Sequence, residues 1–193
     1  MLSDGWRLCH IPVERMPDID TRCWRNNQGR DSQHLDDIVI IGGPNGAGKT
    51  TTAQLLVPQD LEIREFVNAD EIARGLSPFN PERAALVAGR LMLERIRELI
   101  KNRQSFAFET TCSGRTHIPI LRRCKADGWR VTLVYLWLPS PEAALDRVAR
   151  RVREGGHGIP DDVVVRRYWA GLSNLRHWQT WRSFTIIRMD TAR

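Results

Sequence analysis

A glycine-rich run directly after an apolar stretch constrains this chain more than any other feature. Residues Gly43 to Thr50 read Gly-Pro-Asn-Gly-Ala-Gly-Lys-Thr, and they follow the candidate strand Ile38–Ile41. They match the pattern G-x-x-x-x-G-K-[ST], in which backbone N–H groups of the turn point at phosphate oxygens and the next helix offers its positive end. In that pattern Lys49 reaches the β- and γ-phosphates, and the Thr50 hydroxyl binds Mg²⁺.

A chance match in a glycine-rich turn is the alternative interpretation. The strand before the loop and the segment Thr51–Leu56 after it, however, give the context that the motif needs. The sequence therefore predicts a bound nucleoside triphosphate with Mg²⁺. The residues expected to hold it are Gly43, Pro44, Asn45, Gly46, Ala47, Gly48, Lys49, Thr50 and Thr51.

The length and composition of the chain fit one soluble domain. It has 193 residues, 41% of them hydrophobic, and a domain typically takes on the order of 100 to 200 residues. No window approaches the roughly 18 uninterrupted apolar residues of a membrane span, and the N-terminus lacks the order of a secretory signal. We therefore expect the cytoplasm. The four cysteines form no C-x-x-C pair, which favours reduced thiols and implies no metal other than Mg²⁺.

The formal charge of +6 invites a nucleic-acid interpretation, but its distribution argues against one. Most of the excess lies in residues 147–182, where eight arginines face three acidic residues. That segment is not a lysine-rich tail, and the chain has no recognisable helix-turn-helix or aromatic RNA-binding signature. The phosphates of a nucleotide are the better partner, and neither nucleic acid nor a membrane is expected.

The chain divides into an irregular N-terminal extension, 1–35, and one domain, 36–193. The extension shows no period of 2 or 3.6, although Trp6 and Trp24 could dock on the core. From residue 37 strands and helices alternate, with candidate strands at 37–42, 64–68, 105–109 and 130–138. This order predicts an α/β chain with the three-layer P-loop NTPase or kinase fold, a mainly parallel sheet flanked by helices.

Two helix starts are clear, because Asn80-Pro81 and Ser140-Pro141 each place a capping residue before a proline. The first helix is expected to run to about Arg103. Its predicted buried face consists of Leu86, Met92, Leu93, Ile96, Leu99 and Ile100.

Asp70 is the candidate general base. It follows the strand 64–68, at the sheet edge where ligands bind, and phosphoryl transfer needs a carboxylate near the attacking hydroxyl. Two other roles compete with this one. Asp70 could cap the helix that starts there, or it could hold Mg²⁺ through water.

A compact polar group after the strand 105–109 is the candidate acceptor site. Its carboxylate and hydroxyls suit a hydroxylated substrate such as a sugar. The alternative is that the hydroxyls only cap the next helix and that the arginine is solvated. The predicted substrate-binding residues are Glu109, Thr110, Thr111, Ser113 and Arg115.

The segment 147–176 is interpreted as an arginine-bearing lid. Two helical stretches are joined by the break Gly155-Gly156, and both carry arginines that could stabilise the charge of a phosphoryl group in transfer. Arginine is abundant in this chain, so the cluster is favoured rather than any one member. His157 shapes the turn in this interpretation.

Taken in order, these segments resemble the zeta toxin family of P-loop kinases. The matching text is Gly42–Thr50, Asn68–Asp70, Phe108–Thr111, Arg153–Pro160 and Arg166–Tyr168. The resemblance implies a small-molecule kinase that uses ATP or GTP, a phosphotransferase with an alcohol acceptor. Characterised members phosphorylate UDP-N-acetylglucosamine and are blocked by an antitoxin, which makes a sugar nucleotide and an antitoxin the implied partners.

The resemblance also implies roles for single residues. Lys49 grips phosphate and Asp70 deprotonates the sugar hydroxyl, while Glu109 and Thr111 face the sugar nucleotide. The implied lid arginines are Arg153 and one of Arg166 and Arg167.

The chain departs from the family pattern in two places. Cys112 and His117 stand where larger apolar or aromatic residues are expected, and the segment Ser183–Arg188 follows the lid unusually soon, so the last strand is expected to be shortened or replaced. A catalytically weak nucleotide-binding module, or an ATPase without kinase activity, is therefore the competing function. A motor ATPase is disfavoured, because no apolar strand ending in Asp-Glu follows the phosphate loop.

Overall fold

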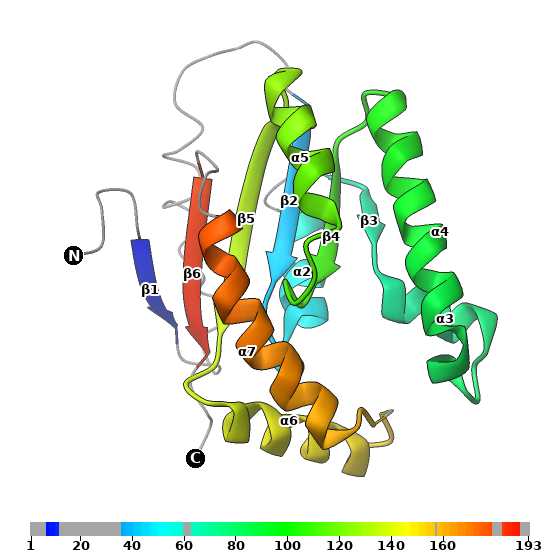
Figure 1. Cartoon of the computed structure of the whole chain (residues 1–193), viewed down its shortest axis with the longest axis vertical. Helices are drawn as coiled ribbons and strands as arrows, with labels where there is room; N and C mark the ends of the chain where they lie inside the picture. Colours follow the sequence, from blue (N-terminus) through cyan, green and yellow to red (C-terminus); the bar gives the residue numbers. More distant parts are fainter. Residues whose placement is uncertain (1–6, 12–35, 60–62, 157, 179–182, 190–193) are drawn as a thin grey trace.

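A computed structural model describes residues 7–11, 36–59, 63–156, 158–178 and 183–189 (Figure 1). Strands and helices alternate along most of this length, as the sequence predicts. The elements in chain order are β1 (Arg7–Ile11), β2 (Asp37–Gly42), α2 (Lys49–Gln59), β3 (Glu65–Val67), α3 (Ala69–Leu76), α4 (Pro81–Lys101), β4 (Phe106–Thr110), α5 (His117–Ala126), β5 (Arg130–Trp137), α6 (Pro141–Arg153), α7 (Asp161–Trp178) and β6 (Ser183–Met189).

The six strands form one sheet in the order β1-β6-β5-β2-β4-β3, and all neighbouring pairs are parallel. β2 lies in the interior between β4 and β5, with Ile41 opposite Glu109 on one side and Val134 on the other. Because the strands are parallel, their carboxyl ends meet at one edge, toward which the arrows of Figure 1 point. The predicted parallel sheet is thus confirmed.

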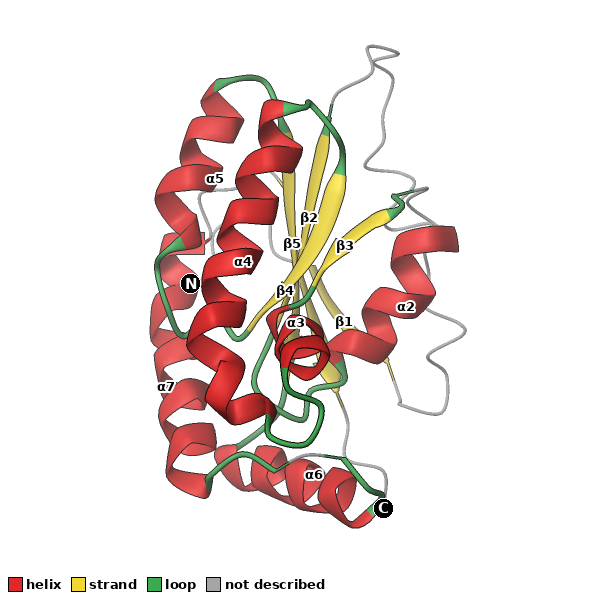
Figure 2. Ribbon diagram, turned by 90° about the vertical axis from the view of Figure 1, so that its right-hand side faces the viewer, coloured by secondary structure: helices red, strands yellow, loops and turns green. Residues whose placement is uncertain are grey.

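Helices cover both faces of the sheet, which gives three layers. α4, α5 and α7 lie on one side and α2 on the other (Figure 2), and α6 joins the side of α2 through Ala144 and Val148. Interior strands covered on both faces must be apolar throughout, and five of the six residues of β2 are buried. Side chains that alternate along each strand feed the two clusters, so Ile38 and Ile40 pack on one side while Val39 and Ile41 pack on the other.

The long helix α4 packs through most of the expected face, with Met92, Ile96 and Leu99 buried and Leu93 and Ile100 partly buried, but Leu86 does not belong to it. Its buried residues are Ala84, Ala88, Met92, Ile96 and Leu99, whereas Leu86 is 81% exposed. The small side chains of Ala84 and Ala88 contact Ala73 of α3. The start of α4 therefore packs on α3, and Leu86 faces solvent.

The N-terminal extension needs one correction. Residues Arg7–Ile11, expected to be irregular, form β1, which pairs along Thr185–Met189 of β6. β1 lies at the edge of the sheet and lacks the continuous apolar run by which the interior strands are recognised. The other residues of 1–35, including Trp6 and Trp24, lie outside the described residues.

The last strand is also present, although the sequence suggested a shortened or replaced one. β6 pairs with β5 on one side and with β1 on the other. Within the described part of the chain, no helix is long and apolar enough to cross a membrane.

Candidate functional site

The phosphate loop joins β2 to α2 at the carboxyl edge of the sheet. Gly43, Gly46 and Gly48 have φ angles of 146°, 77° and 85°, a region that glycine enters at little cost. A Cβ atom on Gly43 would lie 2.5 Å from the Leu136 carbonyl oxygen, so the strand neighbour also requires glycine there. The loop therefore has the tightly curled backbone that its sequence pattern predicts, with the N-terminus of α2 directly behind it.

Lys49 lies between the loop and two carboxylates. Its ammonium group donates a hydrogen bond to the Pro44 carbonyl oxygen over 3.0 Å. Burial lowers the pKa of Lys49, while the charges of Glu109 and Asp70 oppose that shift. Lys49 is thus a cation that a further anion would stabilise.

Glu109 lies on the same side of β4 as Ala107, the side that α2 covers. Alternation along the strand sends Phe106 and Phe108 to one core cluster and Ala107 to the other, which it shares with α2. Glu109 has the parity of Ala107; its carboxylate accepts a hydrogen bond from the side chain of Thr50. Burial raises the pKa of Glu109, and Lys49 opposes that shift. The sequence had placed Glu109 against the acceptor, but the structure places it beside the proposed Mg²⁺ ligand.

Asp70 is free of the capping role that sequence reasoning left open. The N-cap of α3 is Asn68, whose side-chain oxygen accepts hydrogen bonds from the backbone N–H groups of Asp70 at 2.8 Å and Glu71 at 3.4 Å. The Asp70 carboxylate is exposed in the first turn of the helix. Its position follows from the cap, since Asn68 fixes where α3 begins after β3.

A cleft of about 320 Å³ brings Asp70 together with one lid arginine. One wall is formed by α3 and the start of α4, and the other by the segment Gly158–Pro160 and α7. The charged lining residues are Asp70, Glu82 and Arg167, and the rest are small or apolar. Glu82 was not predicted, because only the packing of α3 on α4 brings it to this cleft.

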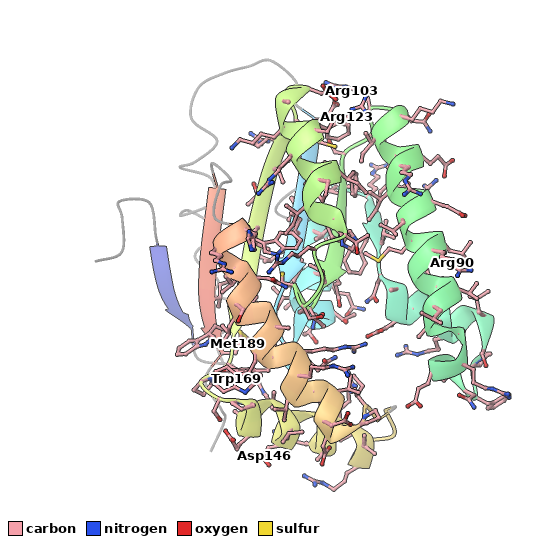
Figure 3. All side chains as sticks on the ribbon, in the orientation of Figure 1. Arg90, Arg103, Arg123, Asp146, Trp169 and Met189 are labelled. Carbon is pink, nitrogen blue, oxygen red and sulfur yellow. The ribbon has the colours of Figure 1, made fainter. Side chains whose placement is uncertain are left out.

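The other predicted lid arginines lie elsewhere. Arg153, the last residue of α6, and Arg166 are both exposed, and neither lines the cleft. Of the adjacent pair in α7, Arg167 is therefore the member that faces Asp70. Figure 3 shows further arginines, Arg103 and Arg123, at the opposite end of the molecule from α6, so arginine by itself identifies no site here.

Two arginines of α6 that the sequence analysis did not single out lie near the loop. A Cβ atom on Gly46 would lie 3.0 Å from both the Ala144 carbonyl oxygen and the Arg147 Cβ, so α6 packs directly across the loop. Arg151 is close enough to Lys49 that its charge lowers the lysine pKa. Their spacing of four residues, on the side of α6 next to buried Ala144 and Val148, is the sequence signal that could have revealed them.

Buried polar atoms without partners surround this region. Asn45 Oδ1, Glu109 Oε1 and Arg147 Nη1 are each buried and make no hydrogen bond within the described part of the chain. Buried polar groups are normally satisfied, and exceptions often mark a binding site. A bound nucleotide with Mg²⁺ could supply partners for the two acceptor oxygens and for the arginine donor, next to a positively charged loop.

The polar side chains of the loop after β4 make their hydrogen bonds within the protein. Thr111 and Ser113 hydrogen-bond each other at 2.7 Å, and the Thr110 hydroxyl accepts from the Cys112 N–H at 3.1 Å. Arg115 donates to the Asn174 side-chain oxygen over 2.8 Å. The cap of α5 is Thr116, without a side-chain hydrogen bond. The predicted substrate hydroxyls therefore neither cap that helix nor line the cleft.

Asn174 of α7 anchors this loop and was missed by sequence reasoning. It is buried, and its amide donates to the carbonyl oxygens of Cys112 at 3.1 Å and Ser113 at 2.9 Å. One helical turn earlier, a Cβ atom on Gly171 would lie 2.8 Å from the Thr111 carbonyl oxygen. α7 thus packs directly on the loop backbone.

Of the two residues that depart from the family pattern, Cys112 is buried within this loop and His117 is half-buried at the start of α5. Cys112 has a φ of 56°, and a Cβ atom on Gly42 would lie 2.9 Å from its sulfur, so little space remains for a larger side chain. Burial raises the Cys112 pKa to about 12. His117 stacks on Phe108 with ring centroids 5.0 Å apart, and burial lowers its pKa to about 4.

Comparison with known proteins agrees with the family resemblance of the sequence. The family model described as Zeta toxin matches residues 23–192. An uncharacterized protein of Haemophilus influenzae is 35% identical over 130 residues, which cover 67% of this chain and 91% of that protein.

Solved structures show a similar fold. The PezAT chromosomal toxin–antitoxin system of Streptococcus pneumoniae matches with a TM-score of 0.63 and 16% identity, over 93% of this chain and 80% of that one. AvrRxo1-ORF1:-ORF2 with ATP matches with a TM-score of 0.57 and 17% identity, over 80% of this chain and 52% of that one.

Proposed function

Because the chain belongs to the zeta toxin family of P-loop kinases, we propose that it transfers the γ-phosphoryl group of ATP or GTP to a hydroxyl of a small molecule. The observation that carries this proposal is the cleft that Asp70 shares with Arg167, together with the electrostatic effect of Asp70 on Lys49 of the phosphate loop. A proton acceptor and a cation that face one space are what in-line phosphoryl transfer needs from the protein.

The nucleotide is assigned to the loop and to its buried neighbours. The backbone N–H groups of residues 43–48 would bind the phosphates, with Lys49 and Thr51 at the start of α2. Thr50 and Glu109 would hold Mg²⁺, the hydroxyl directly and the carboxylate through its hydrogen bond to that hydroxyl. When bound, Mg²⁺ neutralises charge on the phosphate oxygens.

Asp70 would accept the proton of the attacking hydroxyl. Its carboxylate is not used as a helix cap, and it projects from a first turn whose position Asn68 fixes. Arg167 would stabilise negative charge on the phosphoryl oxygens from the opposite wall of the cleft. Arg153 and Arg166 stay candidates for a closed form of the lid, in which exposed side chains can approach the phosphates.

The acceptor proposed first is UDP-N-acetylglucosamine, on the strength of the family. The sugar hydroxyls would meet Asp70 and Glu82, two carboxylates suited to hydroxyl donors. The loop residues Thr110, Thr111, Ser113 and Arg115 would act on the acceptor through the position of their backbone, since their side chains bind one another or α7. An antitoxin is the proposed protein partner in the cytoplasm, because the similar PezAT structure is a toxin–antitoxin system.

The test is a phosphoryl-transfer assay with two arms, one with a defined acceptor and one with a mixture of metabolites. The protein is incubated with Mg²⁺ and ATP, and either UDP-N-acetylglucosamine or a bacterial metabolite extract. Mass spectrometry then looks for the gain of one phosphoryl group. Asp70→Asn is the matched inactive control, since it keeps the shape of the side chain.

Each outcome decides a different part of the proposal. Phosphorylated UDP-N-acetylglucosamine supports both the kinase and the acceptor. Another phosphorylated metabolite keeps the kinase and replaces the acceptor. Release of ADP with no phosphorylated product would overturn the kinase in favour of an ATPase.

A further inference from the structure

Arg147 has a geometry that no contact among the described residues explains. It lies in α6, on the turn that packs across the phosphate loop, with its Cβ 3.0 Å from the place of a side chain on Gly46. Its Nη1 atom is buried and makes no hydrogen bond within the described residues. No acidic side chain in that part of the chain forms an ion pair with it; Arg150, a like charge, is the neighbour that acts on it.

Such an arrangement costs stability in the protein alone. A guanidinium nitrogen removed from water without a partner loses its hydration and gains nothing in return. Burial accordingly lowers the pKa of Arg147. A charged donor in this state would be stabilised by an anion, and the anion-binding surface next to it is the loop Gly43–Thr50.

We propose that Arg147 binds the phosphate chain of the nucleotide that the loop holds. The inference rests on the proposed function only for the presence of a nucleotide, and it does not depend on the acceptor. It adds a phosphate ligand from α6, the helix that covers the loop, about two turns before the Gly155-Gly156 break. Since α6 follows β5, the neighbour of β2, the fold itself brings this helix over the loop.

The chain offers a matched control. Arg150 lies in the same helix, is exposed, and pairs with Glu154 at 3.2 Å. Replacing either arginine by methionine removes one charge and keeps an unbranched side chain. A general effect of positive charge on nucleotide binding changes both variants equally, whereas a direct contact changes only Arg147→Met.

The experiment measures the affinity of wild type, Arg147→Met and Arg150→Met for Mg·ATP and for inorganic tripolyphosphate, together with the melting temperature without ligand. We expect Arg147→Met to bind both ligands about 10- to 100-fold more weakly, the loss typical of a charged hydrogen bond. Without ligand it should melt at a higher temperature than wild type, because the unpartnered charge is gone. Arg150→Met should resemble wild type in both respects.

The results that would contradict the proposal can be told apart. Equal affinities of Arg147→Met and Arg150→Met, or an Arg147→Met protein that binds tripolyphosphate normally and ATP weakly, would overturn the phosphate contact. A lower melting temperature of unliganded Arg147→Met would mean that the arginine is structural. If that variant does not fold, Arg147→Lys must still lose affinity for both ligands relative to Arg150→Lys. A wild-type protein that binds neither ligand refutes the nucleotide site itself.

Discussion

The two polar regions at the carboxyl edge of the sheet differ in how their buried groups are satisfied. Around the phosphate loop, Asn45, Glu109 and Arg147 each keep a buried polar atom that finds no partner among the described residues. In the loop after β4, Thr111, Ser113 and Asn174 all bind within the protein. Two groups that look equally polar in the sequence thus differ in the structure: one keeps buried atoms that we expect a ligand to pair with, and the other joins β4 to α7.

This difference changes what substitutions should do. Removing a group prepared for a ligand should weaken binding or catalysis with little loss of stability. Removing a group that joins two elements should cost stability and leave ligand affinity unchanged. The predictions below test that separation, from the largest expected effect to the smallest.

Asp70→Asn should slow phosphoryl transfer by about 10² to 10⁴, the range for loss of a positioned general base. Stability and affinity for Mg·ATP should stay at wild-type values, because Asn68 caps α3. Single-turnover transfer and thermal unfolding measure the two effects. Normal transfer by a folded Asp70→Asn protein would show that Asp70 does not act on the substrate as a general base.

His117 is an exception near the joint between β4 and α7, because its buried Nε2 atom has no partner among the described residues. Burial lowers its pKa to about 4, so the ring is neutral when folded. An unfolded histidine has a pKa of about 6.5; stability should therefore be complete above pH 6.5 and fall as the pH drops toward 4. The loss is on the order of 3 kcal/mol.

Urea unfolding of wild type and His117→Phe between pH 7 and 4 measures this effect. Phenylalanine can keep the stacking on Phe108 and cannot titrate. The difference in stability between the two proteins should change over this range, and an unchanging difference would show that His117 is not the titrating group.

Asn174→Leu should cost about 1 to 3 kcal/mol of stability, because the carbonyl oxygens of Cys112 and Ser113 lose their donor. Affinity for Mg·ATP should not change. The control is Ser173→Ala, at an exposed position of the same helix. A variant of Asn174 that is stable and binds nucleotide weakly would place this residue with the ligand groups.

Gly171→Ala and Gly89→Ala should change stability in opposite directions. Both glycines lie within helices, but a Cβ atom at 171 would meet the Thr111 carbonyl oxygen at 2.8 Å, whereas at 89 it would meet none of the described atoms within 4 Å. Gly89→Ala should gain up to about 1 kcal/mol from helix propensity. Gly171→Ala should be destabilised, and equal gains in urea unfolding would contradict the tight packing of α7 on the loop.

Local patterns predicted the parts of the molecule that depend on neighbouring residues. The phosphate loop and the starts of α4 and α6 follow from a few adjacent residues, and all were recognised. The role of Arg147 was not, because it depends on α6 packing across Gly46, about a hundred residues earlier in the chain. The hydroxyls of Thr111 and Ser113 suggested a substrate because the sequence does not show that they bond each other, in a loop whose backbone is held by Asn174 from another helix.

The pairing of β1 with β6 bears on how the chain folds during synthesis. β2, which carries the phosphate loop, pairs with β4 and β5, so its part of the sheet can form before the last residues are made. β1 must wait for β6, near the other end of the chain, and such distant pairings form slowly. A chain that begins at Asp36 would keep the complete loop but leave the backbone of β6 without its outer partner, an exposed edge that favours aggregation.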